Sequence, residues 1–148
     1  MKIMFVCHGN ICRSPMAEFV LRRMAEQEGV ALEVSSSATS TEEIWNGIGN
    51  TVYPPAREEL RKHGIDCTGK RAQLLRCEDY DRYDLLIGMD EENLRNMLRL
   101  FGGDPEGKVR KLLDRDVDDP WYYGHFDRVY QQIEAGCRSL LQEIKEEW

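Results

Sequence analysis

The sequence predicts an α/β protein with a doubly wound sheet of about four parallel strands, flanked by helices on both faces. Short apolar runs of strand length alternate with longer stretches whose apolar residues recur at helical spacing, which is typical of parallel sheets with right-handed crossovers. The chain has 148 residues, of which 41% are hydrophobic. That suffices for one core but not for two ordinary domains, so we expect a single small domain over residues 1–148.

The first third of the chain predicts two strands, one helix and a long loop. Residues 2–6 (KIMFV) form a short apolar run that we interpret as a buried strand, and residues 15–28 have the apolar spacing of a helix that Gly29 ends. A second strand is expected at residues 32–34. Residues 35–55 are rich in Ser, Thr, Gly and Asn and predict a loop, and loops of this length are commonly functional.

The remainder continues the alternation. A charged helix opens at Pro54 or Pro55, because proline suits the first helical turn, and Gly64 ends it. Asp90 is well placed as the N-cap of a later helix. The other expected elements are a strand at 84–89, a helix at 91–100, a strand at 108–113 and a long amphipathic helix at 126–144.

Charge and cysteine content exclude several classes of function. The formal net charge of −7 argues against nucleic acid or an anionic membrane as a partner, so an anionic ligand would need a local positive site. No stretch predicts a membrane span or a signal peptide, and we expect a cytoplasmic protein. Five cysteines without paired CxxC spacing predict reduced thiols rather than a zinc site.

The stretch CHGNICRS stands where the first strand passes to the first helix. Gly9 and Asn10 can both adopt positive φ and turn successive amide groups toward one centre, which the helix N-terminus makes more positive. Arg13 adds a forked donor that matches two phosphate oxygens, and Ser14 adds a hydroxyl. The same field favours the thiolate of Cys7, so this stretch predicts a phosphate site with a nucleophilic sulfur.

The segment DRDVDDPWYYG supplies candidates for a general acid. Attack on a phosphomonoester expels an alkoxide or phenoxide, and a carboxylic acid near the site would protonate it. Asp119 is the best candidate, because Pro120 fixes the backbone after it and Trp121 and Tyr122 offer ring faces to a flat substrate. The competing carboxylates, which we interpret as solvated loop charges, are Asp114, Asp116 and Asp118.

CHGNICRSP near the N-terminus and DDPWYYG about a hundred residues later resemble the low-molecular-weight protein-tyrosine phosphatases. VSSSAT, KHGI and GMDEENL occur between them in the expected order, so the resemblance covers essentially the whole chain. It implies hydrolysis of phosphotyrosine in proteins, with no metal or other cofactor, and competition by inorganic phosphate or vanadate. Cys7 would form a cysteinyl-phosphate, Arg13 would clamp the phosphate, and Asp119 would act first as acid and then as base.

The resemblance also implies supporting roles. Asn10 would hold the strained loop with a bond from Ser36, and Ser14 would assist the thiolate. Cys12 would trap an oxidised Cys7 as a disulfide, which prevents irreversible thiol oxidation. The loop residues expected to contact the substrate are His8, Gly9, Asn10, Ile11, Cys12 and Ser14.

One departure from the family concerns loop support. Many relatives carry His-x-Ala-Arg-Gln where this chain has GKRAQ, beginning at Gly69, so the histidine that supports the Asn–Ser network is absent. We therefore expect the loop to be supported differently.

Specificity is expected to depend on the walls of the pocket. Ile11 favours phosphotyrosine, whereas related protein-arginine phosphatases have Thr there. With Trp121, Tyr122 and Trp45 it would form an apolar slot for a phenyl ring, too deep for phosphoserine.

Three alternatives to a tyrosine phosphatase remain open. A protein-arginine phosphatase is one. A thiol-dependent arsenate reductase needs two further relay cysteines, and Cys67 and Cys77 lie in the wrong segment. A phosphopeptide-binding module without turnover would not need Asp119.

Overall fold

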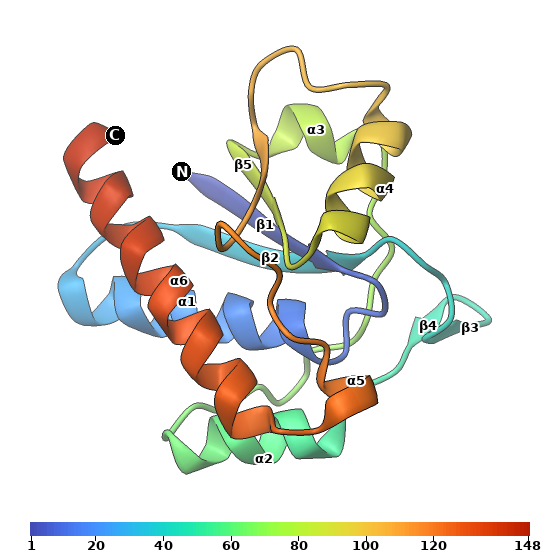
Figure 1. Ribbon diagram of the computed structural model, residues 1–148, viewed down its shortest axis with the longest axis vertical. Coiled ribbons are helices and arrows are strands. Elements are labelled where there is room, and N and C mark those ends of the chain that lie inside the picture. Colours follow the sequence, from blue (N-terminus) through green and yellow to red (C-terminus); the bar gives the residue numbers. More distant parts are fainter.

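A computed structural model describes the backbone of residues 1–148 and every side chain except that of Tyr123. Four parallel strands form one sheet in the order β2-β1-β5-β6 (Figure 1). Their bounds are β1 (Lys2–Cys7), β2 (Glu33–Ala38), β5 (Leu85–Gly88) and β6 (Val109–Lys111). The predicted α/β class with a parallel sheet of four strands is confirmed.

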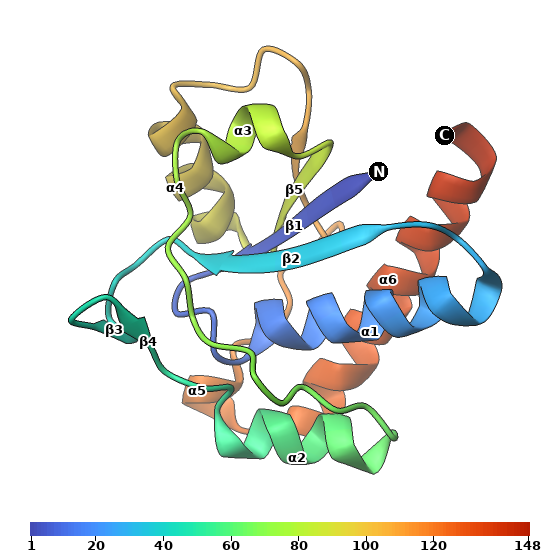
Figure 2. The ribbon, with the colours of Figure 1, turned by 180° about the vertical axis from the view of Figure 1, so that it is seen from behind.

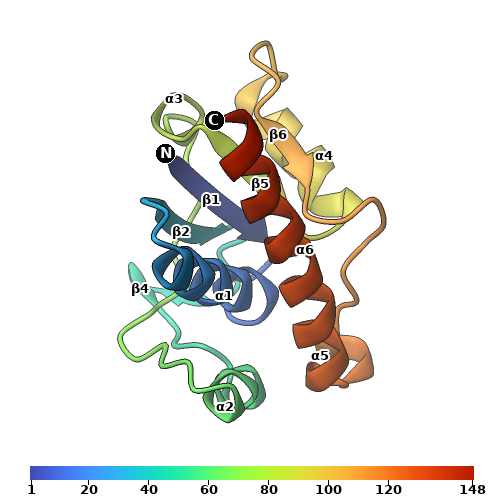
Figure 3. The ribbon, with the colours of Figure 1, turned by 90° about the vertical axis from the view of Figure 1, so that its left-hand side faces the viewer.

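Helices cover both faces of this sheet. On one face α1 and α6 pack together, with α2 against them, and on the other lie α3 and α4 (Figures 1 and 3). The bounds are α1 (Arg13–Glu28), α2 (Pro54–Lys62), α3 (Asp79–Arg82), α4 (Glu91–Phe101) and α6 (Phe126–Glu147). No helix within the described part of the chain is both long enough and apolar enough to cross a bilayer.

The two covered faces explain why β1 is apolar without interruption from Ile3 to Cys7. Ile3 and Phe5 belong to the core cluster shared with α1 and α6, whereas Met4 and Val6 belong to a second cluster on the opposite face. Successive side chains of a strand point to opposite faces, so a strand covered on both sides needs an apolar residue at every position. Each such side chain contributes about 1.5–3 kcal/mol by leaving water.

The structure differs from the sequence-based expectation between residues 33 and 53. Strand β2 extends to Ala38, because the buried hydroxyls of Ser36 and Ser37 find partners within the protein. The predicted loop contains a hairpin of β3 (Ile44–Trp45) and β4 (Ile48–Gly49). The single-turn helices α3 and α5 (Pro120–Tyr123) were also not expected.

A close backbone approach holds the hairpin in place. A Cβ atom at Gly49 would lie 1.8 Å from the carbonyl oxygen of Ala72, so only glycine fits there. Thr51 also forms an isolated bridge with Arg71. The hairpin is thereby fixed against the segment that precedes α3.

The carboxyl ends of the strands meet at one edge. Figure 2 shows that the hairpin and α5 lie at the end of the molecule toward which β2 runs. The chain passes from β2 across β1 to β5, so the strand order reverses between β1 and β5. Ligands bind at such switch points, and β1 ends here at Cys7 while Asp90 follows β5.

Candidate active site

The loop between β1 and α1 takes its shape from one strained residue. Of the two residues able to adopt positive φ, Asn10 does so, with a φ of 61° in the left-handed region, and Gly9 does not. The carbonyls of Cys7, His8 and Ile11 accept hydrogen bonds from backbone amides of neighbouring segments outside the loop. With these carbonyls engaged outside the loop, its amide groups are available to the cavity side.

The Cys7 sulfur lines the cavity and has two hydrogen-bonding partners. The backbone N–H of Asn10 donates to it at 3.3 Å, and the hydroxyl of Ser14 lies 2.9 Å away. The residue is only 4% exposed, yet it lines the cavity. Donors directed at sulfur favour its thiolate form, which is the nucleophile.

The Asn10 side chain joins the loop to two neighbouring segments. Its amide nitrogen donates to Ser14 Oγ at 2.8 Å and to Ser36 Oγ at 2.9 Å. Its oxygen accepts the backbone N–H of Gln73 at 3.1 Å. Three partners therefore hold the residue in its strained conformation, and the predicted contact between Asn10 and Ser36 is present.

Lys70 provides the support that the sequence left open. Its ammonium group donates to the carbonyl of Ser36 at 2.9 Å and lies 3.5 Å from Glu18, whose carboxylate also accepts the Ser36 hydroxyl at 2.6 Å. Burial lowers the pKa of Lys70, and the negative charge of Glu18 opposes that shift. Lys70, the residue after Gly69, thus reaches the network of Asn10 and Ser36 that was expected to lack its histidine support.

Arg13 is buried and held by three groups. One terminal nitrogen donates to Asp90 at 2.9 Å and to the carbonyl of Val117 at 3.0 Å, and the other lies 3.8 Å from Asp119. Burial alone would lower the pKa of Arg13, but the negative charges of Cys7, Asp90 and Asp119 raise it. Asp90 also caps α4, so one carboxylate fixes both a helix and the guanidinium.

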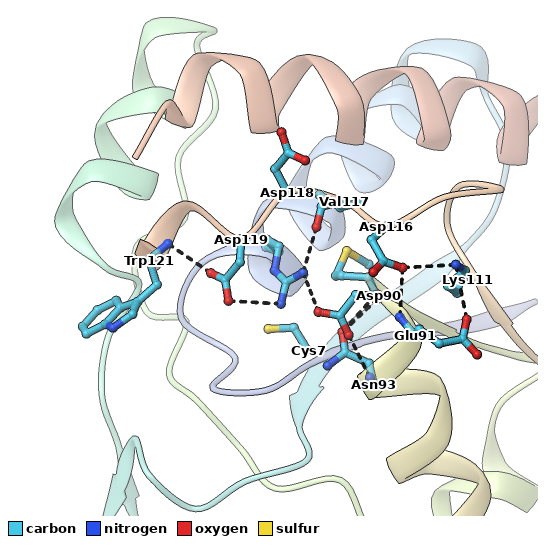
Figure 4. A network of polar contacts seen from close by, with 12 residues as sticks. Cys7, Asp90, Glu91, Asn93, Lys111, Asp116, Val117, Asp118, Asp119 and Trp121 are labelled. Carbon is cyan, nitrogen blue, oxygen red and sulfur yellow. Dashed lines mark hydrogen bonds and ion pairs between the residues drawn. The ribbon is translucent and has the colours of Figure 1, made fainter. Parts of the chain in front are cut away.

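The structure separates Asp119 from its competitors. Asp119 lines the cavity and points toward Cys7, whereas Asp118 points toward α6 and pairs with Arg128 (Figure 4). Asp116 binds the ammonium of Lys111, away from the cavity. Asp114 is exposed and does not line the cavity.

A short turn holds Asp119 at the cavity. Its carboxylate accepts the backbone N–H of Trp121 at 3.0 Å, and Pro120 begins the single turn of α5 that Gly124 ends. An Asp followed by Pro is the sequence signal of such a turn, although it was not used to predict α5.

The cavity has a volume of about 370 Å³ and combines charged and apolar walls. Ile11, Trp121 and Tyr122 line it, and Trp121 packs against the ring of Tyr53 at a centroid distance of 5.1 Å. Trp45 does not line it: its side chain is 70% exposed on the hairpin. The prediction that Trp45 forms part of the slot is therefore wrong, because the hairpin carries this ring into solvent.

The mouth of the cavity is acidic, which the sequence did not reveal. Glu42, Glu43 and Glu92 line it, and the ring of His8 lies 3.0 Å from the carboxylate of Glu42. These residues come from the loop before β3 and from the first turn of α4. Only the fold brings them together.

Cys12 lies at the start of α1 and lines the same cavity as Cys7. Burial raises the pKa of the Cys12 thiol, and the negative charges of Cys7 and Asp119 raise it further. Cys12 is thus held as a neutral thiol. Among the described side chains, no group of three or more His, Cys, Asp or Glu residues is arranged to hold a metal ion.

The parallel sheet, the loop after β1 and the Asp-Pro turn place this chain among the small α/β phosphatases. A family model described as low molecular weight phosphotyrosine protein phosphatase matches residues 2–148, and the chain belongs to this family.

Individual relatives agree with this assignment. The chain is 36% identical over 152 residues to the low molecular weight protein-tyrosine-phosphatase YfkJ of Bacillus subtilis, covering 98% of this chain and 96% of that protein. It is also 36% identical to the low molecular weight phosphotyrosine protein phosphatase of Sus scrofa, covering 97% of this chain and 95% of that protein.

Solved structures show the same fold. The crystal structure of YfkJ superposes with a TM-score of 0.93 at 35% identity, covering 99% of this chain and 96% of that one. A structure of YwlE arginine phosphatase superposes with a TM-score of 0.85 at 29% identity, covering 99% of this chain and 97% of that one. The shared fold therefore includes both a tyrosine and an arginine phosphatase.

Proposed function

We propose that this protein hydrolyses phosphotyrosine in proteins through a cysteinyl-phosphate on Cys7, without a metal ion. The observation that carries the proposal is the convergence of Cys7, Arg13 and Asp119 on one cavity at the carboxyl edge of the sheet. The family assignment supports the same chemistry.

The first step transfers the phosphoryl group to sulfur. The Cys7 thiolate attacks phosphorus, a phosphorus–sulfur bond forms, and the bond to the tyrosine oxygen breaks. Asp119 gives its proton to the leaving phenoxide, and Arg13 donates to two of the phosphoryl oxygens. Arg13 is already oriented by Asp90 and Val117, so its donors are in place before the substrate arrives.

The second step releases phosphate. Asp119, now ionised, takes a proton from a water molecule whose oxygen attacks phosphorus, and the phosphorus–sulfur bond breaks. The departing sulfur regains its contacts with the hydroxyl of Ser14 and the N–H of Asn10. Inorganic phosphate and vanadate would occupy the same site and compete with substrate.

The apolar wall favours phosphotyrosine over phosphoarginine. Ile11 is 8% exposed and packs with Ala72, so it offers a phosphoguanidine no polar partner. Trp121 and Tyr122 line the same cavity and can contact a phenyl ring. Ile11→Thr should therefore shift the ratio of kcat/KM from phosphotyrosine toward phosphoarginine, and a wild-type enzyme that already prefers phosphoarginine would contradict this assignment.

Three variants test the chemistry with p-nitrophenyl phosphate in metal-free, mildly acidic buffer. Cys7→Ser should abolish turnover while phosphate binding persists. Asp119→Ala should lower kcat by about 10² to 10⁴, with a smaller loss for substrates whose leaving groups need no proton. Asp118→Ala is the matched control, because its carboxylate points away, and should be nearly unchanged.

The proposal fails if Cys7→Ser retains activity or if the Asp118 and Asp119 variants lose it equally. Oxidative protection of Cys7 by Cys12, cytoplasmic localisation and the lack of nucleic-acid and membrane partners stay predictions.

A further inference from the structure

Lys70 and Glu18 form an ion pair in the interior behind the catalytic loop. Their side chains are 9% and 6% exposed, and neither residue touches the cavity. Arg22 is the second cation at Glu18, but its side chain is 41% exposed. Isolated buried charges are strongly disfavoured, so Lys70 depends on Glu18, and Glu18 has Lys70 as its buried cation and Arg22 as its exposed one.

The carboxylate of Glu18 fixes the direction of the hydrogen bonds that start from it. A carboxylate only accepts, so the hydroxyl of Ser36 must donate its proton to Glu18. The oxygen of Ser36 then accepts from the amide nitrogen of Asn10. The backbone N–H of Gln73, which only donates, holds the amide oxygen of Asn10 from the other side. Both contacts require the same orientation of this amide.

This orientation decides which atom donates in the contact between Ser14 and Cys7. Heavy-atom positions alone leave either group as the donor at 2.9 Å. The oxygen of Ser14 already accepts the second amide proton of Asn10, so its own proton is directed to the Cys7 sulfur. A hydroxyl that donates to sulfur stabilises the thiolate and not the thiol.

We propose that Lys70 is a positioning residue that holds Glu18 as a hydrogen-bond acceptor, so that Ser36, Asn10 and Ser14 pass a fixed donor direction to Cys7. The inference rests on the proposed function of Cys7 as nucleophile. Without the Lys70 charge, the buried Glu18 carboxylate would keep only the partly exposed Arg22 as a cation and would take up a proton more readily. A protonated Glu18 would donate to the oxygen of Ser36. The hydroxyl proton of Ser36 would then point toward the amide N–H of Asn10, where two donors would face each other.

Lys70 is also a cation in the field of the thiolate. The charged groups that interact with Lys70 are Glu18 and Arg22 from α1 and Cys7 from the end of β1. On the cavity side, Arg13 interacts with Cys7, Asp90 and Asp119. Loss of Lys70 therefore removes a positive charge near the sulfur as well as the fixed donor direction, and both changes disfavour the thiolate.

The test measures the Cys7 thiolate directly, by the rate of alkylation with iodoacetamide as a function of pH. Peptide mass analysis separates Cys7 from Cys77, which is exposed and serves as an internal reference in each sample. Lys70→Met removes the charge and the donor, Lys70→Gln removes the charge but keeps a donor, and Lys70→Arg keeps both. Lys62→Met is the matched control, since Lys62 also pairs with a buried glutamate, but on α2.

We expect Lys70→Met and Lys70→Gln to move the alkylation profile of Cys7 to higher pH, with kcat lowered by about tenfold or more. Lys70→Arg should restore part of the wild-type profile, and Lys62→Met should not move it. Lys70→Gln combined with Ser36→Ala should lower the rate by less than the product of the two single effects, because the part of the Lys70 effect that passes through Ser36 is already lost.

Two results would overturn the inference. One is an alkylation profile of Lys70→Gln that superimposes on the wild-type profile while only the melting temperature falls, which would make Lys70 merely structural. The other is a multiplicative effect of the Lys70 and Ser36 changes. Alkylation reports on the sulfur whether or not the protein turns over phosphotyrosine, so failure here is distinguishable from failure of the proposed function.

Discussion

Asp90 both caps α4 and binds Arg13, and two different substitutions distinguish these roles. Its carboxylate caps α4 by accepting the backbone N–H of Asn93 at 2.8 Å and also binds the buried guanidinium of Arg13. Asp90→Ala removes both contacts. Asp90→Asn removes the charge and keeps one acceptor oxygen, which can cap α4 or accept from Arg13, whereas the two carboxylate oxygens of Asp90 do both.

The two costs follow from these contacts. Loss of an N-cap costs about 0.5–2 kcal/mol, and leaving one partner of a buried ion pair alone costs about 3–5 kcal/mol. Arg13 keeps the carbonyl of Val117 and the more distant Asp119, so the lower end applies and Asp90→Ala should cost about 4 kcal/mol in the free energy of unfolding. Asp90→Asn loses the charge and one of the two hydrogen bonds but leaves the other in place, so it should cost about 2–3 kcal/mol, less than Asp90→Ala.

Urea unfolding of both variants measures the difference in their free energies of unfolding, provided that their m-values are equal. A third variant, Arg13→Met with Asp90→Ala, removes the unpaired charge and should unfold at higher urea than Asp90→Ala alone. Equal losses for Asp90→Ala and Asp90→Asn, or a double variant that is the least stable of the three, would refute the account of Arg13 as a buried charge in need of its partner.

Other predictions concern the mouth of the cavity and the core. Trp121→Ala should raise KM for a phosphotyrosine peptide severalfold, whereas Trp45→Ala should leave kcat/KM for p-nitrophenyl phosphate unchanged; equal effects would contradict the cavity geometry. Glu42→Gln with Glu43→Gln should weaken a preference for peptides with basic residues beside the phosphotyrosine, and more so in low salt than in high salt, which peptide kinetics at two ionic strengths would show. Burial raises the pKa of Tyr130 to about 12. The unfolded chain therefore loses the Tyr130 proton at lower pH than the folded protein does, and the free energy of unfolding should fall as pH rises from 10 toward 12. Urea unfolding at several pH values should show a shallower fall for Tyr130→Phe.

Local patterns were sufficient to place the loop between β1 and α1. The apolar run before Cys7 and the helical spacing after Pro15 define a strand and a helix, and the rule that ligands bind at the carboxyl edge assigns the loop between them to a site. Asp119 was chosen among four carboxylates from the Pro and aromatic residues after it, and the cavity geometry supports that choice.

The parts that depend on long-range packing could not be predicted. Glu18 and Lys70 are charged residues far apart in the sequence, and such residues are exposed by default, so nothing local indicates that they meet in the interior. The prediction for Trp45 was wrong for a related reason. The sequence of a loop does not indicate where an aromatic side chain points, and the short hairpin turns this one into solvent. The three serines after Val34 did not suggest a strand, because their buried partners lie in other segments.

The contacts of Arg13 have a consequence for how quickly anions bind. Its guanidinium is held by Asp90 and Val117 through contacts within the protein itself, so its rotamer entropy is lost when the chain folds. An arriving phosphate then meets a preorganised cradle, and association should be governed by diffusion and dehydration, with negligible rearrangement of the loop.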